Sequence, residues 1–425
     1  MASERAKEVL GSYIGFPQAT ASTRRFARST HDLLCFDELL TNCERLLRDR
    51  VRSFAEGDLA AEIVRHWESA TFPFQFLDQL GKLGICGLTI KGYGCPGLSP
   101  VAAGLVLYEL SRVDASISTF VLVHGSLAAL TIAEMGSEEQ KQRYLPRLAT
   151  CELTGCWALT EPGHGSDAAA METTARKVDG GWVLNGFKRW IGNGTFADVT
   201  VVWARDTASK RVKAFVVEKG SKGHRATKIE NKTALRCVQN ADIVLEDCFV
   251  PDSCELPGAR SFADTAKVLQ TSRVLVAWMV LGVAAGVYDA VHRYVSEREQ
   301  FGVPLAAFAV NQEKLMRMLG AVEACTGLVL RLTRLREEGR ATAGMSALVK
   351  AWVSRQCREA VALGRELMGG NGVVADFHVG KAFCDLEALY TYEGTYDINM
   401  LVAGREATGA AAIRPPGQGP SHSRL

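Results

Sequence analysis

A single carboxylate set among aromatic residues is the first candidate for chemistry in this sequence. The stretch YTYEGTYDIN surrounds Glu393 with Tyr390, Tyr392 and Tyr396. Aromatic rings that exclude water would raise the pKa of the carboxyl toward neutrality, and such a carboxylate suits a general base. A glutamate just before a helix is also common as a solvated charge that complements the helix dipole. The stretch alone leaves both interpretations open.

A glycine-rich loop is the second candidate. GHGSDA, at residues 163–168, fits the dinucleotide pattern G-x-G-x-x-G/A and follows an apparent strand, CWALT. The sequence after it has the pattern of another strand, whereas a Rossmann unit requires a helix there. The remaining interpretations are a plain polar loop, or a Gly/Ser loop whose amides and hydroxyls meet some other phosphate-bearing ligand.

Three further motifs each have a structural and a ligand-binding interpretation. In KRWIGNG, Trp190 is either packed beside a turn or stacked on a flat cofactor. In REQFGVPLAAFAVNQ, Arg298 either complements a helix end or contacts phosphate. In GRELMGGNG, Gly369 and Gly370 either stop a helix or let the backbone approach a ligand closely.

Composition excludes several classes of function. The net charge is +2, so no strong field attracts nucleic acid or an anionic membrane. The 12 cysteines show neither C-x-x-C nor zinc-site spacing, which predicts reduced intracellular thiols and no metal. The longest apolar run, residues 274–287, is too short to span a membrane and predicts a buried helix. His124, His164 and His378 are isolated and expected to be structural, and no nucleophile elbow or Ser-His-Asp motif is present.

The elements that must position these residues fall into three regions, and 425 residues suit two or three domains. Residues 31–155 have helical patterns, including a helix that Gly57 should close and a capping box of Ser137 and Gln140. Short strands without intervening helices predict an antiparallel, barrel-like sheet. Long helices then predict a four-helix bundle. The expected ranges are 1–30 for an N-terminal extension, 31–155 for the helical domain, 156–258 for the β domain, 262–412 for the bundle with helices at 263–300, 310–338, 344–368 and 396–412, and 413–425 for a flexible tail.

Taken in order, these stretches resemble the acyl-CoA dehydrogenase and acyl-CoA oxidase superfamily. The matching segments are ALTEPGHGSD, KRWIGN, REQFGVPLAAFAVNQ, GRELMGGNG and YEGTYDIN, and they extend over nearly the whole chain. Each is weak alone, but their joint order and spacing are specific. The resemblance implies an α+β multidomain fold with FAD bound non-covalently between the middle and C-terminal domains. It also implies a homo-oligomer, commonly a dimer of dimers, in which a neighbouring subunit helps to hold the cofactor.

The resemblance also implies roles for individual residues. Glu393 would remove the α-proton of an acyl-CoA thioester, and its backbone N–H would bind the thioester carbonyl. Residues 298–312 would hold the FAD of a partner subunit. The implied cofactor-binding residues are Trp157, Leu159, Thr160, Gly165, Ser166, Trp190, Ile191, Gly192, Arg298, Gln300, Phe301, Asn311, Gln312, Glu366, Gly369, Gly370, Thr395 and Asp397. The implied substrate-binding residues are Ser166, Arg273, Gly394 and Arg405.

Three departures from the family pattern bear on the reaction. Gly192 stands where many dehydrogenases have a threonine, and its missing hydroxyl would open the flavin edge to O₂. Ser118 stands where glutaryl-CoA dehydrogenase has an arginine, which argues against a dicarboxylyl substrate because a buried carboxylate would lack a cation. Glu366 and Asp397 stand where glutamine is common, so their cofactor contacts are less secure.

Both ends of the sequence carry targeting signals. The terminal Ser423, Arg424 and Leu425 are a variant of the peroxisomal address that an import receptor reads. Residues 19–30 are rich in Arg and Ser, as mitochondrial presequences are, although Glu4 and Glu8 upstream oppose that reading.

Within the family, IKGYGCPGLSP, VHGSLA and CWALTEP are similar to the plant-type peroxisomal short-chain acyl-CoA oxidases, which lie near glutaryl-CoA dehydrogenase. The sequence therefore predicts a peroxisomal FAD enzyme that forms trans-2-enoyl-CoA and passes electrons to O₂, giving H₂O₂. One alternative is a mitochondrial dehydrogenase that uses an electron-transfer flavoprotein, without decarboxylation. Another is a catalytically silent scaffold, against which Glu393 and the full set of motifs argue.

Overall fold

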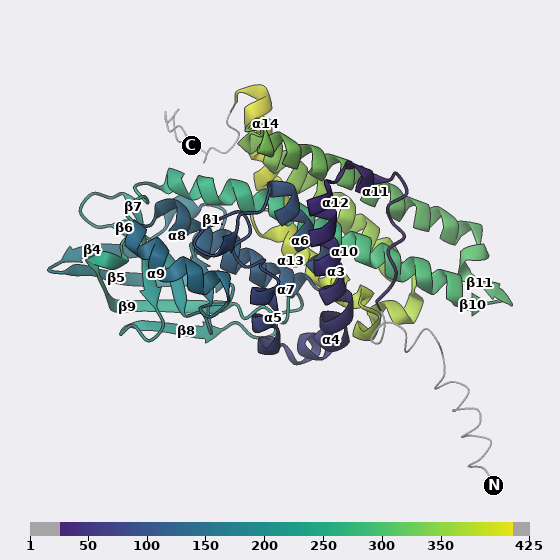
Figure 1. Ribbon diagram of the computed structural model, residues 1–425, viewed down its shortest axis with the longest axis horizontal. Coiled ribbons are helices and arrows are strands. Elements are labelled where there is room, and N and C mark those ends of the chain that lie inside the picture. Colours follow the sequence, from purple (N-terminus) through teal and green to yellow (C-terminus); the bar gives the residue numbers. More distant parts are fainter. Residues whose placement is uncertain (1–25, 411–425) are drawn as a thin grey trace, which may run out of the picture.

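The three predicted regions are present, and the N-terminal helices lie between the β-sheet at one end and the β10–β11 end of the C-terminal helices (Figure 1). The computed structural model describes residues 26–410. The sheet lies at one end and the β10–β11 hairpin at the other, and long helices run between them. Most of the Arg-rich segment and the whole Ser423–Arg424–Leu425 address lie outside the described residues.

The N-terminal region is helical as predicted, with one difference at its start. The helix α3 begins after Thr41, whose side chain forms a capping box with Glu44. Gly57 does not end it, because the chain continues through a π-helical turn, η2, into α4. The elements are η1 (Phe36–Leu39), α3 (Asn42–Phe54), η2 (Ala55–Leu59), α4 (Ala60–Ser69), η3 (Phe74–Phe76), α5 (Leu77–Lys82), β1 (Lys91–Gly92), β2 (Cys95–Pro96), α6 (Pro100–Val113), α7 (Ala115–Val121), η4 (Leu122–Ala129), α8 (Leu130–Met135) and α9 (Glu138–Ala149).

The middle region is a seven-stranded sheet that is antiparallel except where β3 and β4 pair with β6. Within this sheet, β4 and β5 form a hairpin across a turn in which Gly180 has φ 73°. The short helix after the glycine-rich loop is followed by a strand, as expected, and not by a crossover helix. The elements are β3 (Gly155–Ala158), η5 (Ala168–Ala170), β4 (Thr174–Val178), β5 (Gly181–Ile191), β6 (Val199–Asp206), β7 (Val212–Glu218), β8 (His224–Lys228), β9 (Ala241–Pro251) and η6 (Asp252–Cys254).

The C-terminal region contains one helix more than predicted. The additional helix, α13, buries Val379, Leu386 and Leu389 at helical spacing and ends just before Glu393. The elements are η7 (Phe262–Asp264), α10 (Thr265–Glu297), β10 (Glu299–Gln300), β11 (Val303–Pro304), η8 (Leu305–Ala307), α11 (Ala309–Glu337), α12 (Ala343–Leu367), η9 (Gly369–Val373), η10 (Ala375–Phe377), α13 (Val379–Thr391) and α14 (Tyr396–Thr408).

The helix α10 is the central element of the molecule. It packs against α6 on one side and against α11, α12 and α13 on others. The helical stretches Phe262–Glu297 and Ala115–Met135 are each long and apolar enough to cross a membrane, but 100% and 94% of their most apolar windows are buried inside the protein. The apolar run at 274–287 is therefore a core helix, as predicted.

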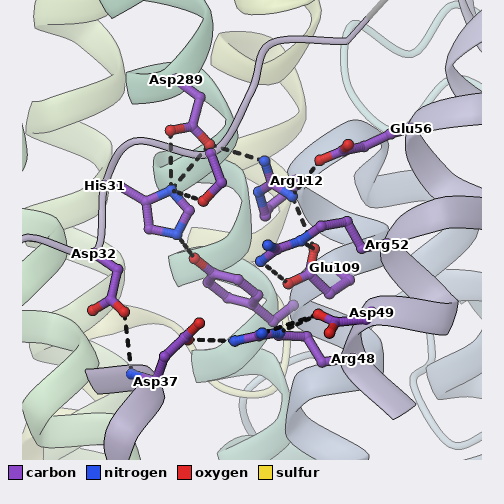
Figure 2. Close-up of polar contacts among 12 residues, drawn as sticks. His31, Asp32, Asp37, Arg48, Asp49, Arg52, Glu56, Glu109, Arg112 and Asp289 are labelled. Atoms are coloured by element: carbon purple, nitrogen blue, oxygen red, sulfur yellow. Dashed lines mark hydrogen bonds and ion pairs between the residues drawn. The ribbon is translucent and has the colours of Figure 1, made fainter. Parts of the chain in front are cut away.

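A buried polar network fastens the N-terminal segment to this core (Figure 2). The imidazole of His31 contacts Asp289 of α10 at 2.9 Å, and Arg112 of α6 pairs with the same carboxylate at 2.9 Å. Arg112 also pairs with Glu109, which in turn binds Arg52 of α3. Buried charges require such mutual pairing, so the network fixes α3, α6 and α10 relative to one another.

Candidate active site

Glu393 lies in a tight turn between α13 and α14. Its φ is 55° and that of Gly394 is 90°. A left-handed glutamate is uncommon, and such strain persists only where surrounding structure enforces it. Two fully buried side chains do so here. The Lys350 ammonium donates to the carbonyls of Tyr390 and Gly394 at 3.0 and 2.8 Å, and the Asn399 amide donates to the Gly394 carbonyl at 2.7 Å.

The carboxyl group of Glu393 is desolvated, although the residue as a whole is half-buried. Burial raises the pKa of Glu393, and a hydrogen bond from Ser272 and the charges of Arg273 and Lys350 oppose that rise. The Ser272 hydroxyl donates to Glu393 Oε2 at 2.6 Å. Burial lowers the pKa of Lys350 to about 7, and the charge of Glu393 opposes this shift.

Sequence reasoning missed Ser272 and Lys350. The signal for Lys350 was present, since it is one cation within the apolar stretch SALVKAWV, but nothing in the sequence indicated its partners. Arg273, which was predicted, lies next to Ser272 on α10, and its buried Nε has no hydrogen-bond partner. An unpartnered buried donor beside the carboxylate is consistent with a ligand that completes the site.

The continuous helical stretch formed by α7 and η4 contacts both the turn that holds Glu393 and the end of β5. The Thr119 hydroxyl of α7 lies 3.2 Å from the Tyr392 hydroxyl. One turn later, Val123 of η4 covers Gly192, where a Cβ would lie 3.3 Å from Val123 Cγ2. Residues four apart share a helix face, so Gly192 and the Glu393 turn face the same region. Gly192 follows Trp190, which has φ 63° and a side chain that is 52% exposed, and the buried Ile191.

Groups within and just after β3 already have partners inside the protein. The Trp157 indole donates to the Thr131 hydroxyl at 3.0 Å and packs edge-on against Trp203, so only the backbone of Trp157 remains for a cofactor contact. Leu159 is buried, and its carbonyl accepts from Lys188. The Thr160 carbonyl accepts from the Arg189 N–H.

A buried ion pair holds the start of the glycine-rich loop in place after β3. Lys188 and Glu161 form a buried pair at 2.8 Å, and Glu161 also accepts the N–H groups of Glu172 and Thr173. Although burial opposes it, the Lys188 charge lowers the pKa of Glu161 to about 2. Beyond this anchor, Gly165 and Ser166 are exposed, as a loop available to a ligand must be.

The residues expected at the adenosine half of the cofactor are not near Glu393 in the same chain. Arg298 follows α10, and β10–β11 lies at the opposite end of the molecule from the sheet (Figure 1). Ser272 and Arg298 are separated by about 39 Å along α10 at 1.5 Å per residue. This distal group comprises Arg298, Gln300, Phe301, Asn311, Gln312, Glu366, Gly369 and Gly370.

Most of the distal group is exposed, and Arg298 and Asn311 are half-buried. Phe301 is 94% exposed with φ 56°, and Gln300 is exposed. Asn311 and Gln312 cap the preceding turn by donating to the Leu305 and Ala306 carbonyls. Glu366 pairs with Lys314, and Gly369 begins η9 in the left-handed region.

The remaining predicted residues lie on α14 or before it. Thr395 caps α14 by accepting the Ile398 N–H, and Asp397 is exposed in the first turn. Arg405 is half-buried and lies about 15 Å from Thr395 along α14. Ser118 is buried and donates to the Leu107 carbonyl at 3.1 Å, and α7, with the sequence ASISTFV, carries no charged side chain.

These features fit a flavin cofactor with an acyl thioester beside it. Among the residues from 26 to 410, the N–H of Glu393 has no hydrogen-bond acceptor. The unpartnered Arg273 Nε and the exposed Trp190 indole add a donor and a flat apolar surface.

Comparisons with known proteins identify the three domains of the chain. Residues 41–152, 156–248 and 262–408 match the N-terminal, middle and C-terminal domains of acyl-CoA dehydrogenases. A short-chain-specific acyl-CoA dehydrogenase of Clostridium acetobutylicum is 33% identical over 85% of this chain and 97% of its own. The mitochondrial short-chain-specific acyl-CoA dehydrogenase of Rattus norvegicus is 32% identical over 85% of this chain and 89% of its own.

A solved structure adds a cofactor to the comparison. Glutaryl-CoA dehydrogenase of Mycobacterium smegmatis, in complex with FADH2, superposes with a TM-score of 0.88 and 34% identity over 90% of this chain and 99% of its own. The chain thus shares the architecture of that enzyme and matches all three domains of the family. The chain belongs to the acyl-CoA dehydrogenase family.

Proposed function

We propose that the protein oxidises an acyl-CoA to its trans-2-enoyl-CoA with FAD as cofactor and Glu393 as the base. The observation that carries the proposal is the environment of Glu393. Its desolvated carboxylate accepts from Ser272, is held in a left-handed turn by Lys350 and Asn399, and faces Arg273. A carboxylate with a raised pKa is a stronger base than an ordinary one.

The residues of this chain act on the thioester in a defined order. The free Glu393 N–H binds the thioester carbonyl, so negative charge that develops on that oxygen meets a fixed donor. Glu393 Oε1 or Oε2 takes the α-proton, and the Ser272 hydroxyl holds the carboxyl in place. FAD held at this site would supply the acceptor for the hydride that leaves the β-carbon. The apolar neighbours Tyr392 and Val123 exclude water from the reacting atoms.

Two copies of the chain are proposed to hold each cofactor. Residues at the end of β5 and at the Glu393 turn would bind the flavin half, and the distal group of a second copy would bind the adenosine half. Two observations support this division: Phe301 is exposed, and Ser272 and Arg298 are separated by about 39 Å along α10. A homo-oligomer of at least two chains follows.

The test is a Glu393→Gln variant compared with Glu387→Gln, a half-buried carboxylate on the neighbouring helix α13 that pairs with Arg358. Anaerobic loss of flavin absorbance with butyryl-CoA reports the chemical step. We expect Glu393→Gln to stay yellow and to lose about 10²–10⁴-fold in rate, the usual contribution of a general base. Glu387→Gln should react as wild type. A Glu393→Gln protein that reacts at the wild-type rate would refute the assignment, and a colourless wild-type protein would support a scaffold role instead.

The electron acceptor has two candidates. The relatives named as dehydrogenases favour transfer to an acceptor protein such as an electron-transfer flavoprotein. Gly192 favours O₂ as the second candidate, because it leaves open a position that a side chain would fill against Val123. Assays under air, with H₂O₂ and acceptor-dye reduction measured together, distinguish these candidates.

A Gly192→Thr variant tests the second candidate directly. If O₂ reacts through this opening, the variant should lose H₂O₂ production while dye reduction continues. Because the added side chain would press on Val123, the double variant Gly192→Thr/Val123→Ala supplies a control with room for the threonine. Unchanged H₂O₂ yield in both variants would eliminate Gly192 as the determinant.

We propose short, monocarboxylic acyl groups as substrates. The buried Ser118 and the uncharged α7 provide no cation for a second carboxylate. Butyryl-, hexanoyl- and glutaryl-CoA, compared under identical conditions, test this, and a preference for glutaryl-CoA would contradict it.

The location of the protein has two candidates. The mitochondrial relative from Rattus norvegicus is compatible with a mitochondrial enzyme, whereas the terminal Ser-Arg-Leu supports a peroxisomal one. Import of the chain with and without residues 423–425 separates these locations.

A further inference from the structure

Two cysteines and a histidine from three separate elements meet in the interior beside the sheet. Cys86 follows α5, His124 lies in η4, and Cys151 follows α9. The two sulfur atoms are 3.1 Å apart. Cys86 and His124 are fully buried and Cys151 is 8% exposed. The proposed reaction uses none of these groups.

The hydrogen bonds of His124 determine its tautomer. The Gly155 N–H donates to Nδ1 at 3.1 Å, so Nδ1 carries a lone pair. Nε2 must then carry the proton, and it lies 2.8 Å from the Leu148 carbonyl, which can only accept. The imidazole is therefore neutral, both of its nitrogens are already hydrogen-bonded, and it lies close to the Cys151 sulfur.

This arrangement favours a thiolate on Cys151. The 3.1 Å contact with Cys86 lowers the pKa of Cys151, and the nearby His124 adds to that effect, while burial opposes it. The Cys86 thiol, in turn, has a pKa well above its ordinary value because of its hydrogen bond to Cys151 and its burial. The pair thus contains one nucleophilic sulfur and one protonated sulfur in contact with it.

The same geometry argues against a metal ion. The two sulfurs and the imidazole are close enough together to be considered as ligands. However, a ligand nitrogen must direct a lone pair at the metal, and the only lone pair of His124 is occupied by the Gly155 N–H. Two sulfurs alone do not complete a structural zinc site.

We propose that Cys86 and Cys151 form an oxidation site at which a hydroperoxide produces a reversible disulfide. The Cys151 thiolate attacks one peroxide oxygen, the O–O bond breaks, and hydroxide leaves, which gives a sulfenic acid. The Cys86 sulfur then attacks the Cys151 sulfur, the S–OH bond breaks, and water leaves with the Cys86 proton. In total, two thiols and one H₂O₂ become one disulfide and two waters.

The Cys86–Cys151 disulfide would lie where the N-terminal helical region packs against the sheet. Closing 3.1 Å to a disulfide bond length of about 2.05 Å requires only about 1 Å of sulfur movement. The linked turn after α9 leads directly into β3, and η4 carries both His124 and the Val123 that covers Gly192. The disulfide would thus tie together the segments on either side of the Gly192 region. The inference is independent of which electron acceptor the protein uses.

The chain provides its own control pair. Cys325 and Cys357 are also buried free thiols in contact, on α11 and α12. The Cys357 pKa is raised well above its ordinary value by the hydrogen bond to Cys325 and by burial, and no histidine is among the groups that shift it. This pair should therefore resist peroxide although its sulfurs are adjacent.

The experiment treats the reduced full-length protein with H₂O₂ and stops the reaction with an alkylating agent in denaturant. Mass spectrometry of a non-reduced digest then quantifies both cross-links. We expect the Cys86–Cys151 link to form at least tenfold faster than the Cys325–Cys357 link and to disappear with dithiothreitol. Its rate should change less than threefold between pH 6.5 and 8, whereas an ordinary thiol becomes more than tenfold faster over that range because its thiolate fraction rises.

Two variants identify the steps. Cys86→Ser should stop at a Cys151 sulfenic acid that dimedone captures, and Cys151→Ser should give neither product. Equal rates for the two pairs, or no Cys86–Cys151 link, would overturn the proposal. Stoichiometric zinc in the purified protein that protects both thiols would overturn it as well. Since every comparison except the variants uses wild-type protein, a variant that fails to fold leaves the test decisive.

Discussion

At the scale of single residues, the strength of the base is set by groups that lie far from it in sequence. Glu393 is recognisable from its aromatic neighbours and its motif. Ser272 is 121 positions away and donates the hydrogen bond that opposes the effect of burial. Its neighbours TSRV on a long apolar helix give no sign of this role, because the contact depends on how α10 and the turn after α13 pack.

Replacing Ser272 with alanine should therefore move the pH dependence of proton abstraction. The reactive form of Glu393 is the carboxylate, so the rate rises as pH increases through its pKa. A hydrogen bond from Ser272 stabilises the carboxylate, and its loss raises the pKa further. We expect the acidic limb to move to higher pH by about one unit, since a hydrogen bond to a charged group contributes about 1.5–3 kcal/mol and one pKa unit is 1.36 kcal/mol.

Anaerobic flavin reduction measured from pH 5 to pH 9 checks this prediction. Ser296→Ala is the matched control, because Ser296 lies on the same helix and its hydroxyl bonds only to the His292 carbonyl. The rate at high pH should be nearly that of wild type in both variants. A limb that stays at the wild-type position in Ser272→Ala would show that this hydroxyl does not tune the base.

At the scale of elements, the glycine-rich loop depends on a buried ion pair. Lys188 of β5 binds Glu161 and the Leu159 carbonyl, and Glu161 holds two backbone N–H groups at the far end of the loop. Lys188→Met leaves the Glu161 charge buried without its partner, which typically costs about 3–5 kcal/mol. Denaturant unfolding should show this loss, with lower affinity for any ligand that Ser166 contacts.

The control for this prediction is Lys177→Met. Lys177 pairs with Asp252 across two exposed side chains, and exposed pairs contribute about 0–1 kcal/mol. The pH dependence gives a second check. The pKa of Glu161 is lowered to about 2, so its ion pair stabilises the fold above the ordinary carboxyl pKa and is lost as pH falls toward 2. Lys188→Met should lack this acid-dependent loss, and equal stability of the two variants at neutral pH would contradict the anchor.

Elements also show where sequence patterns succeed and fail. The β4–β5 hairpin and the capping box of α9 were predictable because each depends on residues close together in sequence. The helix α13 was missed although Val379, Leu386 and Leu389 have helical spacing, because the glycines around it suggested an interruption. Gly57 was predicted to stop a helix, but packing carries the backbone through it as a π-helical turn.

At the scale of the whole molecule, one long helix separates the two halves of the predicted cofactor site. The motif order predicts a flavin site from sequence, yet it does not place residues 298–312 relative to Glu393. That distance follows from α10, which is largely buried and about 50 Å long at 1.5 Å per residue. A site drawn from both ends of such a helix requires a second chain, and closed symmetric pairing supplies two equivalent sites.

Complementation between two inactive chains tests this arrangement. Glu393→Gln removes the base, and Arg298→Ala alters the distal group that would serve the partner. In a mixed dimer, one site combines the intact Glu393 of one chain with the intact Arg298 of the other, while the second site has both defects. Random pairing of co-expressed variants should therefore restore about one quarter of the wild-type sites.

The control co-expresses Arg298→Ala with the double variant Glu393→Gln/Arg298→Ala, in which no pairing yields an intact site. Activity per bound flavin and the mass of the assembly are measured for each mixture. Restoration only in the first mixture requires that base and distal group come from different chains. If both mixtures stay inactive although mixed dimers form, the base and the distal group do not come from different chains, and the proposed division of the site between two chains is wrong.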